Sequence, residues 1–561
     1  MCIYGIDKDY NAVEATKFGL LLKLLEDETL TTLDDTSPIL PSLDENIQCG
    51  NSLLSELDLK GIPRTTKLQI NPHDFQGNKY DVIIGNPPYM KPEDMKNITK
   101  VEFPIYKIKY QSAYKQFDKY FLFIERAIEL LKEDGYLGYI VPSKFTKVGS
   151  ASKLRHLLSS NGFIERVISF GAHQIFESKT TYTCLLIVRK CNTEKCEYLE
   201  IKSLASWKVR NIEEDWYEEI SHDRLEDNGW ILLPSELRSV YDRINEQSIP
   251  LDRIVEDEDN ISNGIQTSAN DLYIIQPLQK DAKYCYFEKD GKEWKIEKTL
   301  TRPYFQTSSG IDNLYTYRLF KPNSIVIYPY KKIKRKIEFV RITELKKNYP
   351  YLSKYLHHNK NLLASPKRDV KPKPETNNEW YRYGRHQALE KCDVPKKIIV
   401  GVLSLGNKYA IDYHHTLISS GGTAGYCMVV VPDHSPYSIY YIQAILNSKY
   451  VEWCCSLIGE VFRGGYIARG TKILKRLPIR QINFTKKEEK VLHSNIASIQ
   501  KKMISIQNQI DKFSKNPRQR ISYEKEFAKE QKNINSLLEK LYDLGTDDGK
   551  IPLIKEMYAA D

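Results

Sequence analysis

The chain has 561 residues, of which 41% are hydrophobic and 28% are charged, and its formal net charge is +10 at pH 7. This length accommodates two to four domains, and the composition is typical of a soluble globular protein. No apolar run is long enough to span a bilayer and no signal-peptide pattern is present, which predicts a cytoplasmic protein without a membrane partner. The mildly basic charge permits a polyanionic partner without proving one.

The sequence contains ten cysteines and 38 tyrosines. The cysteines lack the paired spacing of metal ligands, since Cys191 and Cys196 have neither a second pair nor nearby histidines. We therefore expect reduced thiols and no metal site. Many tyrosines of the second half lie beside lysine or arginine, which suits phosphate contact and base stacking, although tyrosine-rich β domains also occur without nucleic acid.

Residues 2–9 are predicted to form a strand that ends in acidic residues, followed by an amphipathic helix over residues 11–25. Asp9 is predicted to cap this helix, whereas Asp7, at the strand end, is a candidate acceptor for ribose hydroxyls. Residues 46–51 predict another short strand that turns at Gly50. Asn51, at its carboxyl end, could hydrogen-bond a purine edge or simply start a turn.

The most informative stretch is residues 80–89. Residues 81–84 predict a short buried strand ended by Gly85, and Asn86-Pro87-Pro88-Tyr89 follows at the edge where open α/β sheets bind ligands. Two prolines make this turn stiff, so the Asn86 side-chain oxygen and a main-chain carbonyl can accept both hydrogens of one planar amine. The Tyr89 ring can then stack on the same group. An ordinary proline-rich turn is the alternative.

Residues 90–115 are predicted to be a long loop, typical of a lid or a binding loop. An amphipathic helix is expected over residues 117–131, and strands are expected over residues 136–141, 163–170 and 183–188. This alternation of helix and strand predicts an α/β fold with a mostly parallel, layered sheet.

Five segments occur in a fixed order: residues 3–7, 47–52, 83–89, 135–142 and 175–184. Together they resemble the gamma-class N6-adenine DNA methyltransferases, particularly the methylase half of type IIG restriction-modification enzymes. The resemblance implies a Rossmann-like core over residues 1–190, S-adenosylmethionine as methyl donor and adenine in double-stranded DNA as acceptor.

For individual residues, the resemblance implies that Asn86, Pro87 and Tyr89 are catalytic and that Asp7 and Asn51 bind the cofactor. Tyr89 would stack on the flipped base, and Phe176 matches the family position whose aromatic ring supports that base. Core packing is the alternative for Phe176.

The family's first strand and its glycine-rich loop, which holds the methionine end of the cofactor, have no counterpart in this sequence. Met1 falls within the segment that corresponds to the second strand. We therefore expect an N-terminal polypeptide to supply the missing parts. That polypeptide could also carry a nuclease, since no nuclease signature is present here.

Residues 191–250 are predicted to connect to a second domain, an α+β domain over residues 251–482 that resembles a TaqI-like target-recognition domain. Two basic clusters, residues 331–335 (with Lys331 and Lys332) and 367–373, could contact phosphates, although a solvated charged face is the common meaning of such runs. Arg382, Arg385 and His386 are candidates for contacts with base edges.

Within residues 483–545 the apolar positions follow a heptad pattern that is broken at Pro517. This pattern predicts an antiparallel helical hairpin, followed by a tail over residues 546–561.

Two other functions stay open. The chain could be a DNA-recognition subunit without catalysis, or it could methylate a protein glutamine, since that chemistry also uses Asn-Pro-Pro-Tyr. The large tyrosine-rich domain favours DNA over a small protein substrate.

Overall fold

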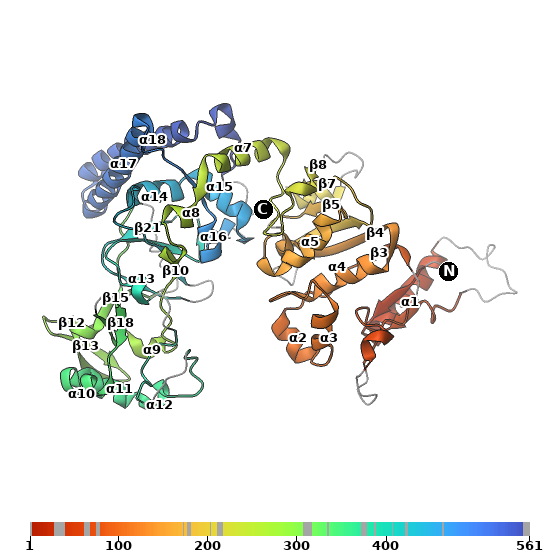
Figure 1. The fold of residues 1–561 in the computed structure, drawn as a ribbon, viewed down its shortest axis with the longest axis horizontal. Helices are drawn as coiled ribbons and strands as arrows, with labels where there is room; N and C mark the ends of the chain where they lie inside the picture. Colours follow the sequence, from red (N-terminus) through yellow and green to blue (C-terminus); the bar gives the residue numbers. More distant parts are fainter. Residues whose placement is uncertain are drawn as a thin grey trace. The chain divides into compact units, whose positions relative to one another are not determined.

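The computed structural model describes residues 3–26, 40–60, 68–73, 79–171, 173–176, 181–201, 203–209, 217–306, 317–333, 336–371, 378–385, 389–406, 408–420, 425–462 and 465–553. The chain forms two compact units, Met1–Ser235 and Glu236–Asp561 (Figure 1). Within the described ranges no helix combines the length and the apolar character that a membrane crossing needs. These ranges also contain no cluster of His, Cys, Asp and Glu side chains suited to a metal ion.

A six-stranded sheet forms the centre of the first unit. In spatial order its strands are β3 (Tyr80–Gly85), β4 (Leu131–Pro142), β6 (Thr183–Arg189), β5 (Ile164–Ser169), β7 (Lys195–Glu200) and β8 (Glu218–Ser221). The helices of this unit are α1 (Tyr10–Leu25), α2 (Pro92–Ile98), α3 (Glu102–Lys109), α4 (Lys119–Leu130), α5 (Ser152–Ser160) and α6 (Leu204–Val209).

The sheet is mixed, so the predicted mostly parallel sheet is wrong. β3 and β4 are parallel, as are β5 and β7, whereas β6 runs antiparallel to both of its neighbours and β8 is antiparallel to β7. A parallel β5–β6 pair would need a crossover connection, usually a helix. The expected connection over residues 191–250 also differs, because β7 and β8 extend this sheet.

β1 (Gly5–Asp7) and β2 (Ile47–Cys49) form a separate two-stranded parallel sheet that packs against α1. The Asp9 side chain accepts a hydrogen bond from the Asn11 backbone N–H at 2.9 Å, so the predicted cap of α1 is confirmed. Among the described residues, β1 pairs only with β2 and β3 pairs only with β4. Each of the two sheets therefore has a strand edge without a partner in this part of the chain.

β3 ends at Gly85 as expected, but it is not a buried strand. The side chains of Val82 and Ile84 point to the same face, because side chains alternate along a strand, and they are 63% and 85% exposed. Apolar β-branched residues favour a buried sheet position. The described residues of this chain leave that face of β3 uncovered.

The predicted helix over residues 117–131 is confirmed as α4, with its apolar face buried. The predicted long loop over residues 90–115 is instead largely helical, because it contains α2 and α3. Pro92 begins α2 at a position where proline is favourable. Met95, Phe103 and Tyr106 anchor these two helices in the core of the first unit.

The second unit contains several small sheets. Their strands, in spatial order, are β10 (Ile261–Asn263), β23 (Tyr426–Val429), β19 (Lys397–Gly401) and β21 (Ala410–Asp412); β11 (Ile274–Ile275), β16 (Ser324–Ile327), β15 (Thr301–Phe305) and β22 (Leu417–Ile418); β12 (Gln279–Lys280), β13 (Tyr284–Lys289) and β14 (Lys292–Glu297); β17 (Tyr330–Ile333) and β18 (Lys336–Phe339); β20 (Leu403–Leu405), β25 (Tyr466–Ala468) and β24 (Val461–Phe462); and β26 (Pro478–Arg480) with β9 (Ser248–Pro250).

The helices that accompany these sheets are α7 (Ser235–Glu246), α8 (Leu251–Ile254), α9 (Asn270–Tyr273), α10 (Ile342–Asn348), α11 (Pro350–His358), α12 (Lys360–Leu363), α13 (Leu389–Cys392), α14 (Ile439–Leu446), α15 (Lys449–Ile458) and α16 (Thr471–Lys475). Two longer helices, α17 (Lys487–Lys512) and α18 (Pro517–Tyr542), lie side by side. Ion pairs join Lys502 of α17 to Glu526 and Glu530 of α18. The buried side chain of Gln500 also donates to Gln443 of α14, so α17 is anchored to the rest of the unit.

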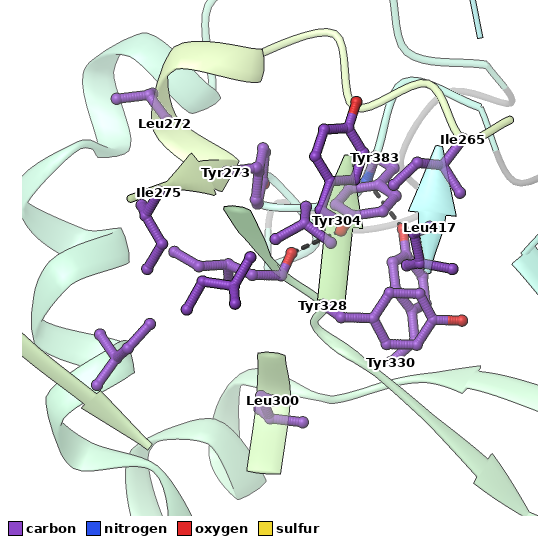
Figure 2. Close-up of a cluster of buried hydrophobic side chains, with 14 of the residues drawn as sticks. Ile265, Leu272, Tyr273, Ile275, Leu300, Tyr304, Tyr328, Tyr330, Tyr383 and Leu417 are labelled. Carbon is purple, nitrogen blue, oxygen red and sulfur yellow. Dashed lines mark hydrogen bonds between the residues drawn. The ribbon is translucent and has the colours of Figure 1, made fainter. Parts of the chain in front are cut away.

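Buried tyrosines fill the core of the second unit, and Figure 2 shows several of them around β15 and β16. Several of their hydroxyls donate to backbone carbonyls: Tyr383 donates to Ile327 at 2.6 Å and Tyr273 donates to Tyr381 at 2.7 Å. A buried hydroxyl needs such a partner. Many tyrosines of the second half therefore belong to the core and are not available to stack on bases.

Candidate active site

The turn Asn86–Tyr89 follows β3 at the carboxyl edge of the sheet. The Asn86 side chain is exposed and donates and accepts no hydrogen bond within the described residues, whereas Pro87 is buried. The Tyr89 hydroxyl donates to the carbonyl oxygen of Ile140 in β4 at 2.9 Å. Desolvation raises the pKa of Tyr89 to about 12, so the hydroxyl keeps the proton that it donates to Ile140. The turn thus presents a free amide beside a fixed aromatic ring.

The N-terminus of α4 supports the same turn. The Lys119 backbone N–H donates to the carbonyl oxygen of Met90 at 2.9 Å. The Tyr120 ring meets the Tyr89 ring edge-on, with centroids 6.0 Å apart, and its hydroxyl donates to the carbonyl oxygen of Pro142. Because β4 and α4 both hold the turn, the position of Asn86 follows from rigid elements.

Asp7 and Asn51 lie at neighbouring strand ends, since the Gly50 N–H donates to the Asp7 carbonyl oxygen at 2.8 Å. The close approach of Ile70 requires glycine there: a Cβ on Gly50 would lie 2.5 Å from the Ile70 carbonyl oxygen. The Asp7 carboxylate is exposed and accepts from the Asp9 N–H at 2.8 Å. A carboxylate has about four acceptor positions, so Asp7 fits a pair of ribose hydroxyls.

Asn51 is 2% exposed, and both ends of its side chain are engaged. Its oxygen accepts from the Leu53 N–H at 3.2 Å and its amide donates to the Tyr106 hydroxyl at 3.1 Å. These contacts match the alternative in which Asn51 starts a turn. They also fix the Tyr106 side chain beside the ends of β1 and β2.

Phe176 is half-buried in the segment that leads from β5 to β6. This segment leaves β5 after Ser169, which pairs with Cys184, and it returns beside Pro142, which pairs with Thr183. The structure therefore brings Phe176 to the same edge of the sheet as Asn86 and Tyr89. Residues 177–180 of the matching segment lie outside the described residues.

Three of the four basic candidates of the second unit have acidic partners in the same unit. Lys331 pairs with Glu344, Arg382 with Glu379 and Arg385 with Asp369. Lys332 is exposed on β17 and makes no ion pair with the described residues. Of the other basic candidates, His386, Lys334, Arg335 and Lys373 lie outside the described residues.

Sequence reasoning missed three side chains near Asp7 and Asn51. Lys8 pairs with Glu102 of α3 at 3.0 Å, and Lys119, the first residue of α4, is only 4% exposed. Burial, and secondly the charge of Lys8, lower the pKa of Lys119 to about 8. A lysine at the start of an amphipathic helix is normally solvated, so the sequence offered no signal for this burial.

Comparisons with known proteins show what the chain is similar to. Residues 1–176 match the family described as Eco57I restriction-modification methylase. Over 558 residues the chain is 48% identical to the type II restriction enzyme and methyltransferase RM.Eco57I of Escherichia coli, a match that covers 99% of this chain and 55% of that protein. It is 23% identical over 465 residues to the type II methyltransferase M.BstVI of Geobacillus stearothermophilus, covering 78% and 74% of the two proteins.

Among solved structures, the type IIL restriction-modification enzyme MmeI in complex with DNA is similar with a TM-score of 0.51. The sequences are 12% identical, and the match covers 99% of this chain and 66% of that chain. This similarity supports the mixed α/β, methyltransferase-like fold. The chain spans only about half the length of the Escherichia coli relative, at 55%.

Proposed function

Because residues 1–176 belong to the Eco57I restriction-modification methylase family, we propose that this chain carries out N6-methylation of adenine in double-stranded DNA within a restriction-modification system. The observation that carries the proposal is the exposed amide of Asn86, which bonds to no described residue and lies beside the fixed ring of Tyr89. S-adenosylmethionine, when bound, supplies an electrophilic methyl group.

The turn suits an amino group attached to a flat ring. The lone pair of the adenine amino nitrogen is delocalised into the ring, which makes it a poor nucleophile. Hydrogen bonds from its two N–H groups to the Asn86 side-chain oxygen and the Pro87 carbonyl oxygen favour a tetrahedral nitrogen. Since that geometry develops only in the transition state, the two acceptors lower the barrier without a strong base.

The base must leave the double helix to reach this turn. Tyr89 offers its ring for stacking, and the hydrogen bond to Ile140 fixes the orientation of that ring before the base arrives. Phe176 is proposed to support the same base, because its segment reaches the same edge of the sheet. A base–aromatic stack contributes about 1–3 kcal/mol per base.

For the cofactor, we propose that Asp7 binds the ribose hydroxyls and that the adenosyl group lies at the adjacent end of β2. The exposed Asp7 carboxylate fits this role. Asn51 acts by shaping the turn and holding Tyr106, because both ends of its side chain are already bonded.

We further propose that another polypeptide segment completes the cofactor site and could carry a nuclease. Two observations support this part of the proposal: β1 and β3 each have an edge that no described strand pairs with, and one face of β3 is exposed. The Escherichia coli relative is described as both a restriction enzyme and a methyltransferase, and it extends well beyond the region that matches this chain.

The direct test is the identity of the methylated atom. Duplex DNA incubated with tritiated S-adenosylmethionine and the completed methylase should, after hydrolysis, yield labelled N6-methyladenine. Labelled glutamine in a protein would instead support protein methylation. Sequence-specific DNA binding without any label in the DNA would support a recognition subunit that lacks catalysis.

The second unit is proposed to contact the DNA backbone, and Lys332 is the side chain to test. Lys332→Ala should reduce the slope of log affinity against log salt by about 1, because each phosphate contact contributes about 0.9 to that slope. Fluorescence anisotropy with a labelled duplex, at several salt concentrations, measures this slope. Lys331→Ala is the matched control: Glu344 already pairs with Lys331, so the change should be smaller. Equal slopes for Lys332→Ala and the parent would exclude Lys332 from the interface.

A further inference from the structure

Lys119 is a buried lysine that forms no ion pair with an acidic side chain among the described residues. It is 4% exposed, and within the described residues its amine makes no ion pair and no hydrogen bond. Lys397 provides the contrast. This lysine is buried too, but its amine pairs with Asp412 at 2.9 Å and donates to the Cys392 carbonyl oxygen at 3.0 Å. A buried lysine is costly unless its amine is paired.

The contacts of Lys119 place its amine beside the proposed adenosyl site. Its Nζ lies 5.9 Å from the centroid of the Tyr106 ring, and the hydroxyl of that ring accepts from Asn51. Lys8 directly follows Asp7 and pairs with Glu102, which lies four residues before Tyr106 and so on the same face of α3.

Electrostatics agree with this position. The pKa of Lys119 is lowered to about 8, chiefly by burial and secondly by the charge of Lys8. The charge of Glu102 acts in the opposite direction and raises this pKa. The amine therefore lies within electrostatic reach of the end of β1 and of α3. The backbone of Lys119 is bonded to Met90, immediately after the Asn86–Tyr89 turn. Lys119 thus links the proposed cofactor site to the catalytic turn.

We propose that Lys119 donates a hydrogen bond to a ring nitrogen of the cofactor's adenine. This inference rests on the proposed function, which places the adenosyl group beside Asp7 and the end of β2. A lysine side chain only donates, and the ring nitrogens of adenine only accept. Asn51 is only 2% exposed, and its oxygen and one of its two amide N–H groups already have partners within the protein. Lys119 then binds the cofactor without taking part in the methyl transfer.

Analogues of S-adenosylhomocysteine that lack one ring nitrogen test this contact. The 1-deaza, 3-deaza and 7-deaza forms should be titrated calorimetrically, alongside S-adenosylhomocysteine itself, into the methylase with its cofactor site complete. One of the three should bind the parent protein about tenfold more weakly or worse, since a hydrogen bond to a charged donor is lost. In Lys119→Met, S-adenosylhomocysteine and that same analogue should bind equally, within about twofold.

Lys8→Met is the matched control, because Lys8 is a neighbouring lysine whose amine is already paired with Glu102. This variant should still discriminate against the same analogue. Equal binding of all three analogues and S-adenosylhomocysteine to the parent would overturn the proposal, and this comparison needs no variant. Discrimination that persists in a folded Lys119→Met protein would overturn it as well. Failure of the parent to bind S-adenosylhomocysteine at all would instead refute the proposed function, and this inference with it.

Discussion

Replacing Asn86 with alanine should lower the rate of methyl transfer about a hundredfold or more, while DNA binding stays nearly unchanged. The substitution removes one of the two acceptors that favour a tetrahedral amino nitrogen. Loss of one such acceptor costs on the order of 3 kcal/mol in the transition state. The Asn86 side chain is exposed and bonds to no described residue, so its removal should not destabilise the fold.

The measurement is tritium transfer from S-adenosylmethionine to duplex DNA by the completed methylase, with DNA affinity measured in parallel. Asn97→Ala is the matched control, since Asn97 is an exposed asparagine of α2 outside the turn. It should keep activity within about twofold of the parent. Activity of Asn86→Ala within a factor of about three of the parent would show that Asn86 is not the acceptor.

The 561-residue chain by itself should bind S-adenosylmethionine weakly or not at all and should not methylate DNA. The strands that would frame the cofactor, β1 and β3, each have an edge without a partner among the described residues. An unpaired strand edge beside exposed apolar side chains requires another strand or leads to aggregation. Cofactor binding should appear in calorimetric titration once a polypeptide that supplies a strand and a glycine-rich loop is added.

Ile84→Lys tests whether β3 takes part in that assembly. Because Ile84 is 85% exposed on β3, the change should leave the lone chain folded, but it would bury a charge once the added polypeptide covers this face of β3. We expect the affinity for the added polypeptide to fall at least about tenfold. Leu362→Lys is the control, since Leu362 is 62% exposed in the second unit. Micromolar cofactor affinity together with turnover by the lone chain would refute the requirement for assembly.

Local elements were predictable from the sequence because their signals are local. The apolar spacing before Leu131 predicted α4, and Asp9 predicted the start of α1. The Asn86–Tyr89 turn was found from its residues, and its place after β3 is confirmed. Strand direction was not predictable, because whether β6 runs parallel or antiparallel depends on pairing between distant segments.

Side-chain environments were the least predictable part of the site. The sequence suggested DNA contacts for three basic side chains that each have an acidic partner in the structure, namely Lys331, Arg382 and Arg385. Of these partners, only Glu379 is a near neighbour in the sequence. Lys119, for which the sequence offered no signal, is buried and lies beside the Tyr106 ring of α3. Such environments follow from tertiary packing, which the pattern of a single segment does not contain.

The tyrosine hydroxyls of the second unit have a consequence for the order of folding. Four of them bind backbone carbonyls that are 41, 56, 83 and 108 residues away along the chain. Contacts between such distant segments form slowly, because long loops must close first. Three of these bonds involve Tyr381 or Tyr383, so the core cannot close before synthesis has passed residue 383. A chain that stops earlier therefore leaves this unit unfolded with its apolar strands exposed, a target for chaperones and proteases.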